Sequence, residues 1–381
     1  MKLFKNLFSV IAILSVISAC NNSPIADSGD ETNTVESISS IYIEPLKIPS
    51  VDQSEAALEK ITYLEKIGEI EEGFSAEEDS FFAQITDLCI DKNNNIYVAD
   101  SKLHTIFKFN KNREYITSFG KEGQGPGEFT GRLRISAGND GNIYVSDHGN
   151  NRFCAFSLNG ELIRQQPLPK NSYDYAVANS EGNTFLLSKN GFNVIDCFDP
   201  EYKYLDSFIE MKYHLNFPFG YPPKLIFKNL LLRPPISGEV LKTISINDDL
   251  FVIFNNSLVV MSYDRTNKLI AQFRIDHPRI IDDLKNQLDN ARKNRGWIYP
   301  IGSIFVDNNG SLCFCYYNSQ LSLPEIYRYE ENGIFIDTLR VKDSYTRSNQ
   351  IVEACDSAGN FFGIDENFSK ISIYKYEEKR P

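Results

Sequence analysis

Three aspartates occupy comparable places in the chain and could bind a metal ion. Asp100 and Asp147 end the related segments NIYVAD and NIYVSD, and Asp365 ends a later apolar segment that also follows a turn. A calcium ion takes about six to eight oxygen ligands, and aspartate carboxylates are common among them. The three residues are therefore candidates for part of a calcium site. The alternative is that each carboxylate binds the backbone of a neighbouring loop and that the chain has no cofactor.

Two histidines lie in the loops that follow the NIYVAD and NIYVSD segments. Because His104 and His148 occupy matching loops, they could lie close together and serve as a base or as metal ligands. Solvated loop side chains are the alternative. The four histidines of the chain are too few and too scattered for a recognisable zinc pattern.

Arginine and aromatic side chains provide the other candidate binding residues. Arg132, Arg134 and Arg152 are grouped in sequence, and a guanidinium group can bind a carboxylate or a sulfated sugar through two parallel hydrogen bonds. Pairing with nearby aspartates is the alternative for these three. Trp297 and Tyr299 could stack on a sugar ring or on a protein partner, or could pack beneath a helix.

No motif in the chain identifies a catalytic residue. The glycines at 120, 123, 125 and 127 resemble a phosphate-binding loop only in their density, because no Lys-Ser/Thr pair follows and no helix begins there. We expect them to allow a tight loop with positive φ angles. The Gly-x-Ser-x-Gly elbow of serine hydrolases is also missing from the sequence.

The start of the chain has the pattern of an export signal. Lys2 and Lys5 precede an apolar segment, residues 7–17, which is too short to span a bilayer comfortably. Residues 17–20, with the sequence ISAC, resemble the lipobox of bacterial lipoproteins. That resemblance implies removal of a signal peptide, residues 1–19, and attachment of lipid to Cys20. A plain secretory signal, or a core helix that ends in cysteine, is the alternative.

The segment after Cys20 is polar and acidic. Residues 20–40 contain too few apolar groups to offset the entropy lost on ordering, so we expect a flexible tether. Without Lys2 and Lys5, 37 basic residues face 51 acidic ones, and the net charge changes from −12 to −14. Such a charge argues against nucleic acid as a partner. The expected location is the bacterial cell envelope, on the outer membrane facing the periplasm by analogy with other lipoproteins.

Copies of one pattern of four short strands recur through the rest of the chain. In the first copy, apolar or alternating segments lie at 87–90, 96–99, 105–109 and 114–119, with no helical period between them. A period of about 40–50 residues with four strands is typical of a β-propeller. Six positions that each begin a second strand mark the copies: Ile96, Ile143, Thr184, Leu250, Leu312 and Phe361.

These six copies predict an all-β, six-bladed propeller over residues 41–381. Two long insertions, residues 211–240 and 279–300, explain the longer gaps between copies, and residues 279–296 have the apolar period of a helix between the fourth and fifth blades. The last copy contains only three strands. Residues 61–68 resemble a fourth strand, so we expect this N-terminal strand to lie beside residues 370–376 and close the ring, which removes two unpaired edges.

The first copies also resemble a known family. The segment NIYVAD, followed by residues 106–109, resembles the core of an NHL-type repeat, and residues 123–129, with the sequence GQGPGEF, resemble a stretch of the six-bladed β-propeller lipoproteins of Bacteroidetes. The resemblance implies a six-bladed propeller on a lipid anchor. Relatives of this family include binding platforms and a few lyases and lactone hydrolases.

Two functions remain open from the sequence. Loops from a fourth strand to the next first strand share a face with the loops between second and third strands, and both insertions belong to that face. Long loops often carry function. The first hypothesis is therefore a membrane-anchored, non-catalytic binding or scaffold propeller that holds a cell-envelope protein or a carbohydrate on this face. The alternative is a divalent-ion-dependent envelope lyase or hydrolase that acts at the channel mouth.

Overall fold

The computed structural model divides the chain into two compact units, residues 1–44 and 45–381, and it describes parts of the second. The described residues are 51, 53–70, 72–75, 78–168, 175–187, 193–210, 240–245, 247–255, 258–294, 301–319, 321, 323–342, 351–365 and 367–377. Several predictions therefore lie outside the described residues: the signal peptide 1–19, Cys20, the tether 20–40, nearly all of the insertion 211–240, Trp297 and Tyr299. Among the described residues, no helix has the length and apolar character needed to cross a bilayer.

Four separate sheets each contain four antiparallel strands in chain order. The first two sheets are formed by β4 (Ile85–Ile90), β5 (Ile96–Asp100), β6 (Thr105–Phe109) and β7 (Tyr115–Phe119), and by β8 (Leu133–Ala137), β9 (Ile143–Asp147), β10 (Arg152–Phe156) and β11 (Leu162–Pro167). The next two are formed by β12 (Val177–Ala178), β13 (Thr184–Leu187), β14 (Asn193–Phe198) and β15 (Tyr204–Glu210), and by β16 (Val240–Ile244), β17 (Leu250–Phe254), β18 (Val259–Tyr263) and β19 (Leu269–Arg274).

The seven strands at the C-terminal end and the N-terminal strand form two further four-stranded units that share one sheet. The fifth unit contains β20 (Ile301–Val306), β21 (Leu312–Asn318), β22 (Leu323–Tyr329) and β23 (Phe335–Val341), and the sixth contains β24 (Ile351–Cys355), β25 (Phe361–Ile364), β26 (Ile371–Tyr376) and the N-terminal strand β1 (Ile61–Ile70). A short hairpin of β2 (Glu72–Ser75) and β3 (Glu78–Phe81) follows β1. The sequence therefore predicted the first residue of all six second strands correctly.

The first strands of the six units contact one another in a closed cycle. β4 contacts β8, and the series continues through β12, β16, β20 and β24 back to β4. Six four-stranded antiparallel sheets joined in this way define a six-bladed β-propeller, so the predicted fold class is confirmed.

A repeated turn explains why the first and second strands pair where they do. In the first blade, Oδ1 of Asp91 accepts hydrogen bonds from the backbone N–H groups of Asn93 and Asn95 at 2.8 and 2.9 Å. Asp307 and Asp356 make the same pair of bonds in the fifth and sixth blades. Aspartate favours this turn because its short side chain can bond the backbone two and four residues further on.

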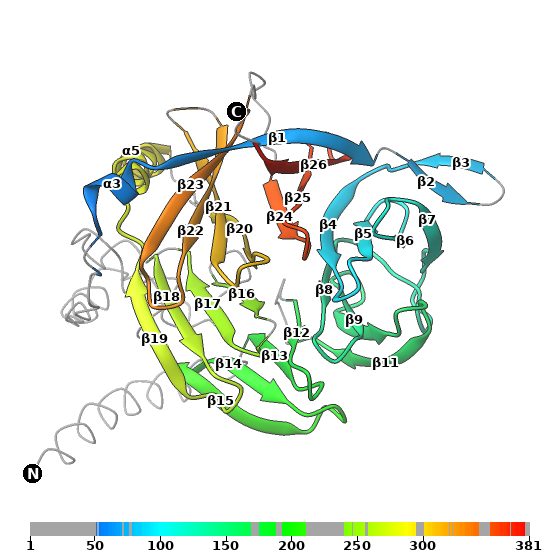
Figure 1. Ribbon diagram of the computed structural model, residues 1–381. Helices are drawn as coiled ribbons and strands as arrows, with labels where there is room; N and C mark the ends of the chain where they lie inside the picture. Colours follow the sequence, from blue (N-terminus) through cyan, green and yellow to red (C-terminus); the bar gives the residue numbers. More distant parts are fainter. Residues whose placement is uncertain are drawn as a thin grey trace, which may run out of the picture. The chain divides into compact units, whose positions relative to one another are not determined.

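The N-terminal strand closes the ring as predicted and also makes a second strand pairing that was not predicted. β1 pairs antiparallel with β26 from Leu64 to Ile70, which places residues 64–68 of the predicted segment along residues 373–376. Its first residues, Ile61–Leu64, also pair in parallel with Thr338–Val341 of β23 (Figure 1). One strand thus joins the outer edges of the fifth and sixth blades. As a result, these two blades form one continuous eight-stranded sheet.

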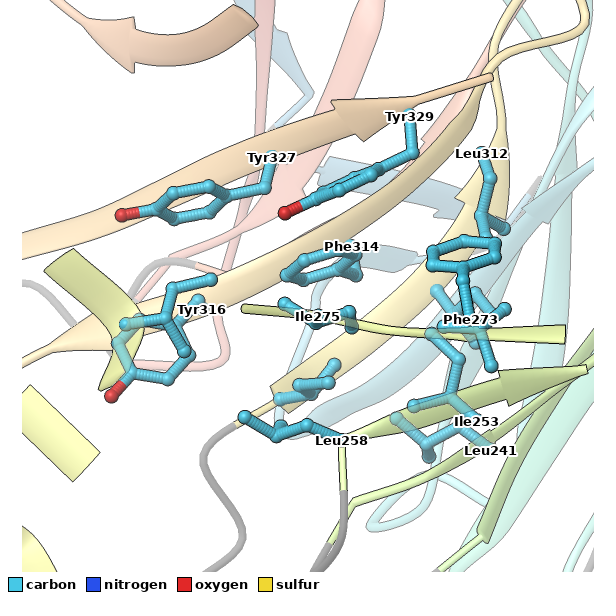
Figure 2. Packing of buried hydrophobic residues seen from close by; sticks show 14 of the residues in the cluster. Leu241, Ile253, Leu258, Phe273, Ile275, Leu312, Phe314, Tyr316, Tyr327 and Tyr329 are labelled. Carbon is cyan, nitrogen blue, oxygen red and sulfur yellow. The ribbon is translucent and has the colours of Figure 1, made fainter. Parts of the chain in front are cut away.

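The core lies between adjacent blades, and its largest cluster joins the fourth and fifth. Phe314 stacks against both Tyr327 and Tyr329, with ring centroids 5.7 and 5.5 Å apart (Figure 2). Tyr329 also stacks on Phe273 of β19 at 5.8 Å. Burial of such large rings contributes much of the favourable free energy of folding.

The predicted helical insertion is present as α5 (Pro278–Asn294), which begins with proline at a position that does not need its N–H group. Ile280 and Leu284 are buried in the same cluster, and Ile281 packs against it, so the first part of the predicted apolar stripe faces the propeller. A second short helix, α3 (Glu55–Leu58), contacts β23.

Candidate functional site

The three candidate metal ligands each bind backbone or side-chain donors of nearby loops. The carboxylate of Asp100 accepts from four backbone N–H groups, those of Ala83, Gln84, Lys102 and Leu103, at 2.6 to 3.0 Å. These bonds tie the loop after β5 to the loop before β4. A carboxylate with two oxygens and four such donors has little capacity left for a cation.

Asp147 and Asp365 are engaged in a comparable way. Oδ1 of Asp147 accepts from the N–H groups of Thr130 and Asn150, and Asp365 accepts from those of Ser369 and Lys370. Within the described part of the chain, no three His, Cys, Asp or Glu side chains gather so that they could hold a metal ion. The structure thus does not bring these three aspartates together, and their geometry matches the alternative of loop capping.

Arg152 supports the glycine-rich loop between the first and second blades. Its two terminal nitrogens donate to the backbone carbonyls of Gln124, Gly125 and Glu128 at 3.1, 2.8 and 2.7 Å. Glu128 in turn accepts from the N–H group of Gly125 at 2.8 Å. Gly120 and Gly127 have φ angles of 92° and 73°, as expected for a tight loop. The guanidinium group of Arg152 is therefore occupied by the protein itself.

Replacement of Arg152 by alanine is expected to loosen this loop and to lower the free energy of unfolding by about 2–3 kcal/mol. Three carbonyls lose a charged donor, and Asp147 loses a cation whose Nε lies 3.4 Å from its Oδ2. Hydrogen exchange of residues 121–129 and urea unfolding measure both effects. Lys111→Ala removes an equal charge from an exposed site and serves as the control. Unchanged exchange in the loop would contradict the assigned role.

The remaining predicted residues fall in different places. His104 adopts a positive φ angle of 55°, and its Nδ1 is buried without a hydrogen-bond partner in the described structure. The N–H group of His148 donates to the carbonyl of Arg132 at 3.2 Å, so these two residues belong to one loop contact. Arg134 differs from the others because it lies inside the propeller.

A cavity of about 350 Å³ occupies the central channel and is lined by the first strand, or its flanks, of every blade. It extends from the middle of these strands to the turns that follow them, where Asp91, Asp307 and Asp356 lie. This end of the channel is opposite to the loops that the sequence favoured. The volume is in the range of small-molecule sites, about 300–1,000 Å³.

The wall of the channel between the first two blades is held by a buried ion pair. Oδ2 of Asp87 accepts from Nε of Arg134 and from the backbone N–H group of Ile135, both at 2.8 Å. This contact orients the guanidinium group, whose terminal nitrogens donate to no residue in the described structure. The side chain of Arg134 retains 19% of its exposure, and the residue lines the cavity.

Next to Arg134, Tyr175 links the third blade to the fourth. Its hydroxyl donates to the carbonyl of Lys242 at 2.5 Å and accepts from the N–H group of the same residue at 2.8 Å. Two cations lie close to the Tyr175 ring: the guanidinium carbon of Arg134 is 4.8 Å and Nζ of Lys242 is 4.7 Å from the ring centroid. Positive charge is thus concentrated on one side of the channel.

Glu353 of β24 contributes an acid to the same cavity. A β-bulge between Val352 and Ala354 leaves Glu353 without a partner on β25, and bulges of this kind re-aim a side chain. Its carboxyl group makes no hydrogen bond to the described residues. Burial raises the pKa of Glu353 to about 8, with help from the negative charge of Asp87, while Arg134 and Arg132 act in the opposite direction. Near neutral pH the group is therefore mostly protonated.

Sequence reasoning found Arg134 but missed the other channel residues. The missed side chains are Asp87, Tyr175, Lys242 and Glu353. A usable signal was present for three of them, because a single charged residue interrupts each of the first strands ITDLCI, VLKTI and IVEAC. Tyr175 precedes the two-residue strand β12 and carries no comparable signal.

Comparison with known proteins agrees with the fold. A family model described as a 6-bladed β-propeller matches residues 75–213, which is the region of the first three blades. No curated protein sequence matches the chain. The chain is a six-bladed β-propeller by its own strand pairing and by this partial match.

Solved structures of low identity are also similar. They include a catalytically inactive virginiamycin B lyase from Staphylococcus aureus with quinupristin (TM-score 0.46, 15% identity, 79% of this chain and 83% of that chain). A protein of unknown function from Bacteroides caccae has a TM-score of 0.42 and 13% identity over 71% of this chain and 85% of that one. The WD40 β-propeller domain of Doa1 has a TM-score of 0.41 and 10% identity, over 79% and 95%. At TM-scores below 0.5, none of these supports a functional argument.

Proposed function

We propose that this chain is a lipid-anchored, non-catalytic binding propeller of the bacterial cell envelope, which holds its ligand in the central channel. The observation that carries the proposal is the cavity of about 350 Å³ that all six blades line, with an oriented guanidinium group and an acid that bonds no described residue on its wall. Polar groups of this kind inside a mostly strand-built wall are the usual elements of a small-molecule site.

A binding role suits the described residues better than a metal-dependent reaction. The aspartates considered for a divalent ion are occupied by loop donors, and Arg152 is occupied by loop carbonyls. The loops before the first strands and after the second strands are therefore built as a frame. In the channel, Arg134 and Glu353 retain hydrogen-bonding capacity that the described residues do not use.

The ligand can be sought directly by extraction. The full chain, purified in detergent from its native membrane, is denatured, and the released small molecules are identified by mass spectrometry. We expect one molecule to be released in stoichiometric amount by the wild type and to be missing from a Glu353→Trp variant, whose larger side chain would fill the cavity. Equal release from both would place the ligand outside the channel. If neither releases a molecule, the binding proposal is wrong.

The anchor is supported by the ISAC segment that ends at Cys20. A Cys20→Ala variant is expected to move from the membrane fraction to the soluble fraction, because a lipid chain supplies about 0.8 kcal/mol of membrane affinity per buried CH₂ group. Metabolic labelling with a radioactive fatty acid measures lipid attachment at the same residue. A Cys89→Ala variant, which changes a buried strand residue, is the control and should remain labelled. Labelling of the Cys20→Ala variant would refute lipidation at this residue.

A further inference from the structure

Two groups in the channel lack partners that would satisfy them. The two terminal nitrogens of Arg134 carry four N–H groups, and none of these donates to a residue that the structure describes. Nε donates to Asp87 at 2.8 Å. The carboxyl group of Glu353 makes no hydrogen bond to the described residues, although the two side chains are close enough to interact electrostatically. No ion pair within 4.0 Å joins Arg134 and Glu353 in the described structure, and both residues line the same cavity.

We infer that the channel binds a small organic anion whose carboxylate accepts hydrogen bonds from the terminal nitrogens of Arg134 and from the carboxyl group of Glu353. This inference rests on the proposed binding function and names the ligand class. A planar guanidinium group matches the two oxygens of a carboxylate, and the Asp87 contact holds it in one orientation before the ligand arrives.

Part of the cavity wall fits an apolar body attached to that carboxylate. Val177, Leu241, Ile304 and Phe305 line the cavity together with the ring of Tyr175. Apolar walls with a few polar groups are the usual composition of such sites. We therefore expect a monocarboxylate whose aromatic or aliphatic body packs against these apolar residues.

Protonation of Glu353 makes its role dependent on pH. The charged and titratable groups around it are Asp87 on β4, Arg132 and Arg134 at β8, and Cys315 on β21. Lys242 on β16 lines the same cavity beside the Tyr175 ring. Below a pH of about 8, Glu353 carries a proton and can donate it in a hydrogen bond. Above that pH the group becomes negative, repels the bound anion and attracts Arg134. Anion affinity therefore falls as the pH rises through 8.

Benzoate and its uncharged analogue benzamide test the inference in a calorimetric titration of the full chain. A ligand of this size in a suitable pocket binds with a dissociation constant of about 1 mM. We expect benzoate to bind about tenfold more tightly than benzamide at pH 7, because only benzoate pairs with the guanidinium group. Benzoate affinity should then fall about tenfold between pH 7 and pH 9.

Two variants assign the effect to the named side chains. Glu353→Gln keeps a donor at this position, so benzoate should still bind and its affinity should no longer change between pH 7 and pH 9. Arg134→Gln should lose about tenfold in benzoate affinity and little in benzamide affinity. Circular dichroism shows whether Arg134→Gln is folded, and the benzoate–benzamide comparison in the wild type does not depend on that variant.

Three other outcomes are possible, and each would contradict the inference. Equal binding of benzoate and benzamide would show a channel that binds neutral molecules, and the proposed binding function would stand. Benzoate binding that is unchanged in both variants would place the anion at another site. If neither compound binds, no carboxylate site exists here, and the extraction experiment alone decides whether the channel holds a different ligand.

Discussion

A Leu64→Asp substitution in β1 is expected to lower the free energy of unfolding by more than about 4 kcal/mol, because it buries a charge without a partner. Leu64 is fully buried and lies where β1 changes partners: it is opposite Val341 of β23 and opposite Tyr376 of β26. Its carbonyl accepts from the N–H group of Lys342 at 2.8 Å. Its side chain joins a cluster that contains Leu339 of the fifth blade.

The neighbouring residue provides a matched control for this prediction. Tyr63 lies on the same strand with 40% of its surface exposed. Tyr63→Asp should change the unfolding free energy by no more than about 1 kcal/mol, although it introduces the same charge. Urea unfolding followed by circular dichroism measures both variants. If Leu64→Asp is as stable as Tyr63→Asp, β1 does not join the two blades in the way described.

An Arg328→Met substitution is expected to lower the free energy of unfolding by about 3–5 kcal/mol, because it leaves buried carboxylates without their cation. Arg328 of β22 donates from Nε and Nη2 to both oxygens of Asp337 on β23, at 2.7 and 2.9 Å. Its Nη1 also donates to Asp307 at 3.0 Å and to the hydroxyl of Tyr376 in the sixth blade at 2.6 Å. One guanidinium group thus connects two blades.

The effect of Arg328 should depend on pH in a defined direction. Burial tends to raise the pKa of Asp337, but hydrogen bonds from Arg328 and Thr62 outweigh it and hold the pKa below its usual value of 3.8. A depressed pKa stabilises the fold above pH 3.8, and this contribution is lost as the pH falls through the folded-state value. The difference between wild type and Arg328→Met should therefore shrink in acid.

Arg265→Met is the control for the loss of an arginine, since Arg265 is exposed in a turn. The free energy of unfolding of this variant should lie within about 0.5 kcal/mol of the wild-type value at every pH. Chemical unfolding at pH 7 and below pH 4 provides the comparison. A cost of less than about 1 kcal/mol for Arg328→Met at pH 7 would mean that the buried network adds nothing that methionine cannot replace.

The fold could be predicted because its signals are local. The turn residues that precede Ile96, Ile143 and Leu312 bond their own backbone, so the start of each second strand follows from a few neighbouring residues. Closure by β1 followed from the missing fourth strand of the last blade. The parallel pairing of β1 with β23 could not be predicted, because it depends on the spatial proximity of Ile61 and Thr338, which no local pattern encodes.

The candidate site was harder to predict because the same residue types serve as structure and as function. Asp100 and Arg152 had the chemistry of a binding site, yet both are occupied by the backbone of neighbouring loops. Glu353 depends on a bulge at Val352 and Ala354, and a bulge is a property of strand register that the sequence does not display. Arg134 was predicted as an anion-binding residue, and its role in the channel remains a proposal.

The most direct test of the account is a pH titration of the Glu353 carboxyl group. Carbon-13 labelling of the glutamate side chains, with Glu353→Gln to assign the signal, reports the protonation of this one group by NMR. We expect it to titrate near pH 8 in the free protein and at a higher pH when benzoate is bound. Titration near the ordinary value of 4.5, unchanged by benzoate, would contradict an unpartnered acid that faces the ligand in the channel.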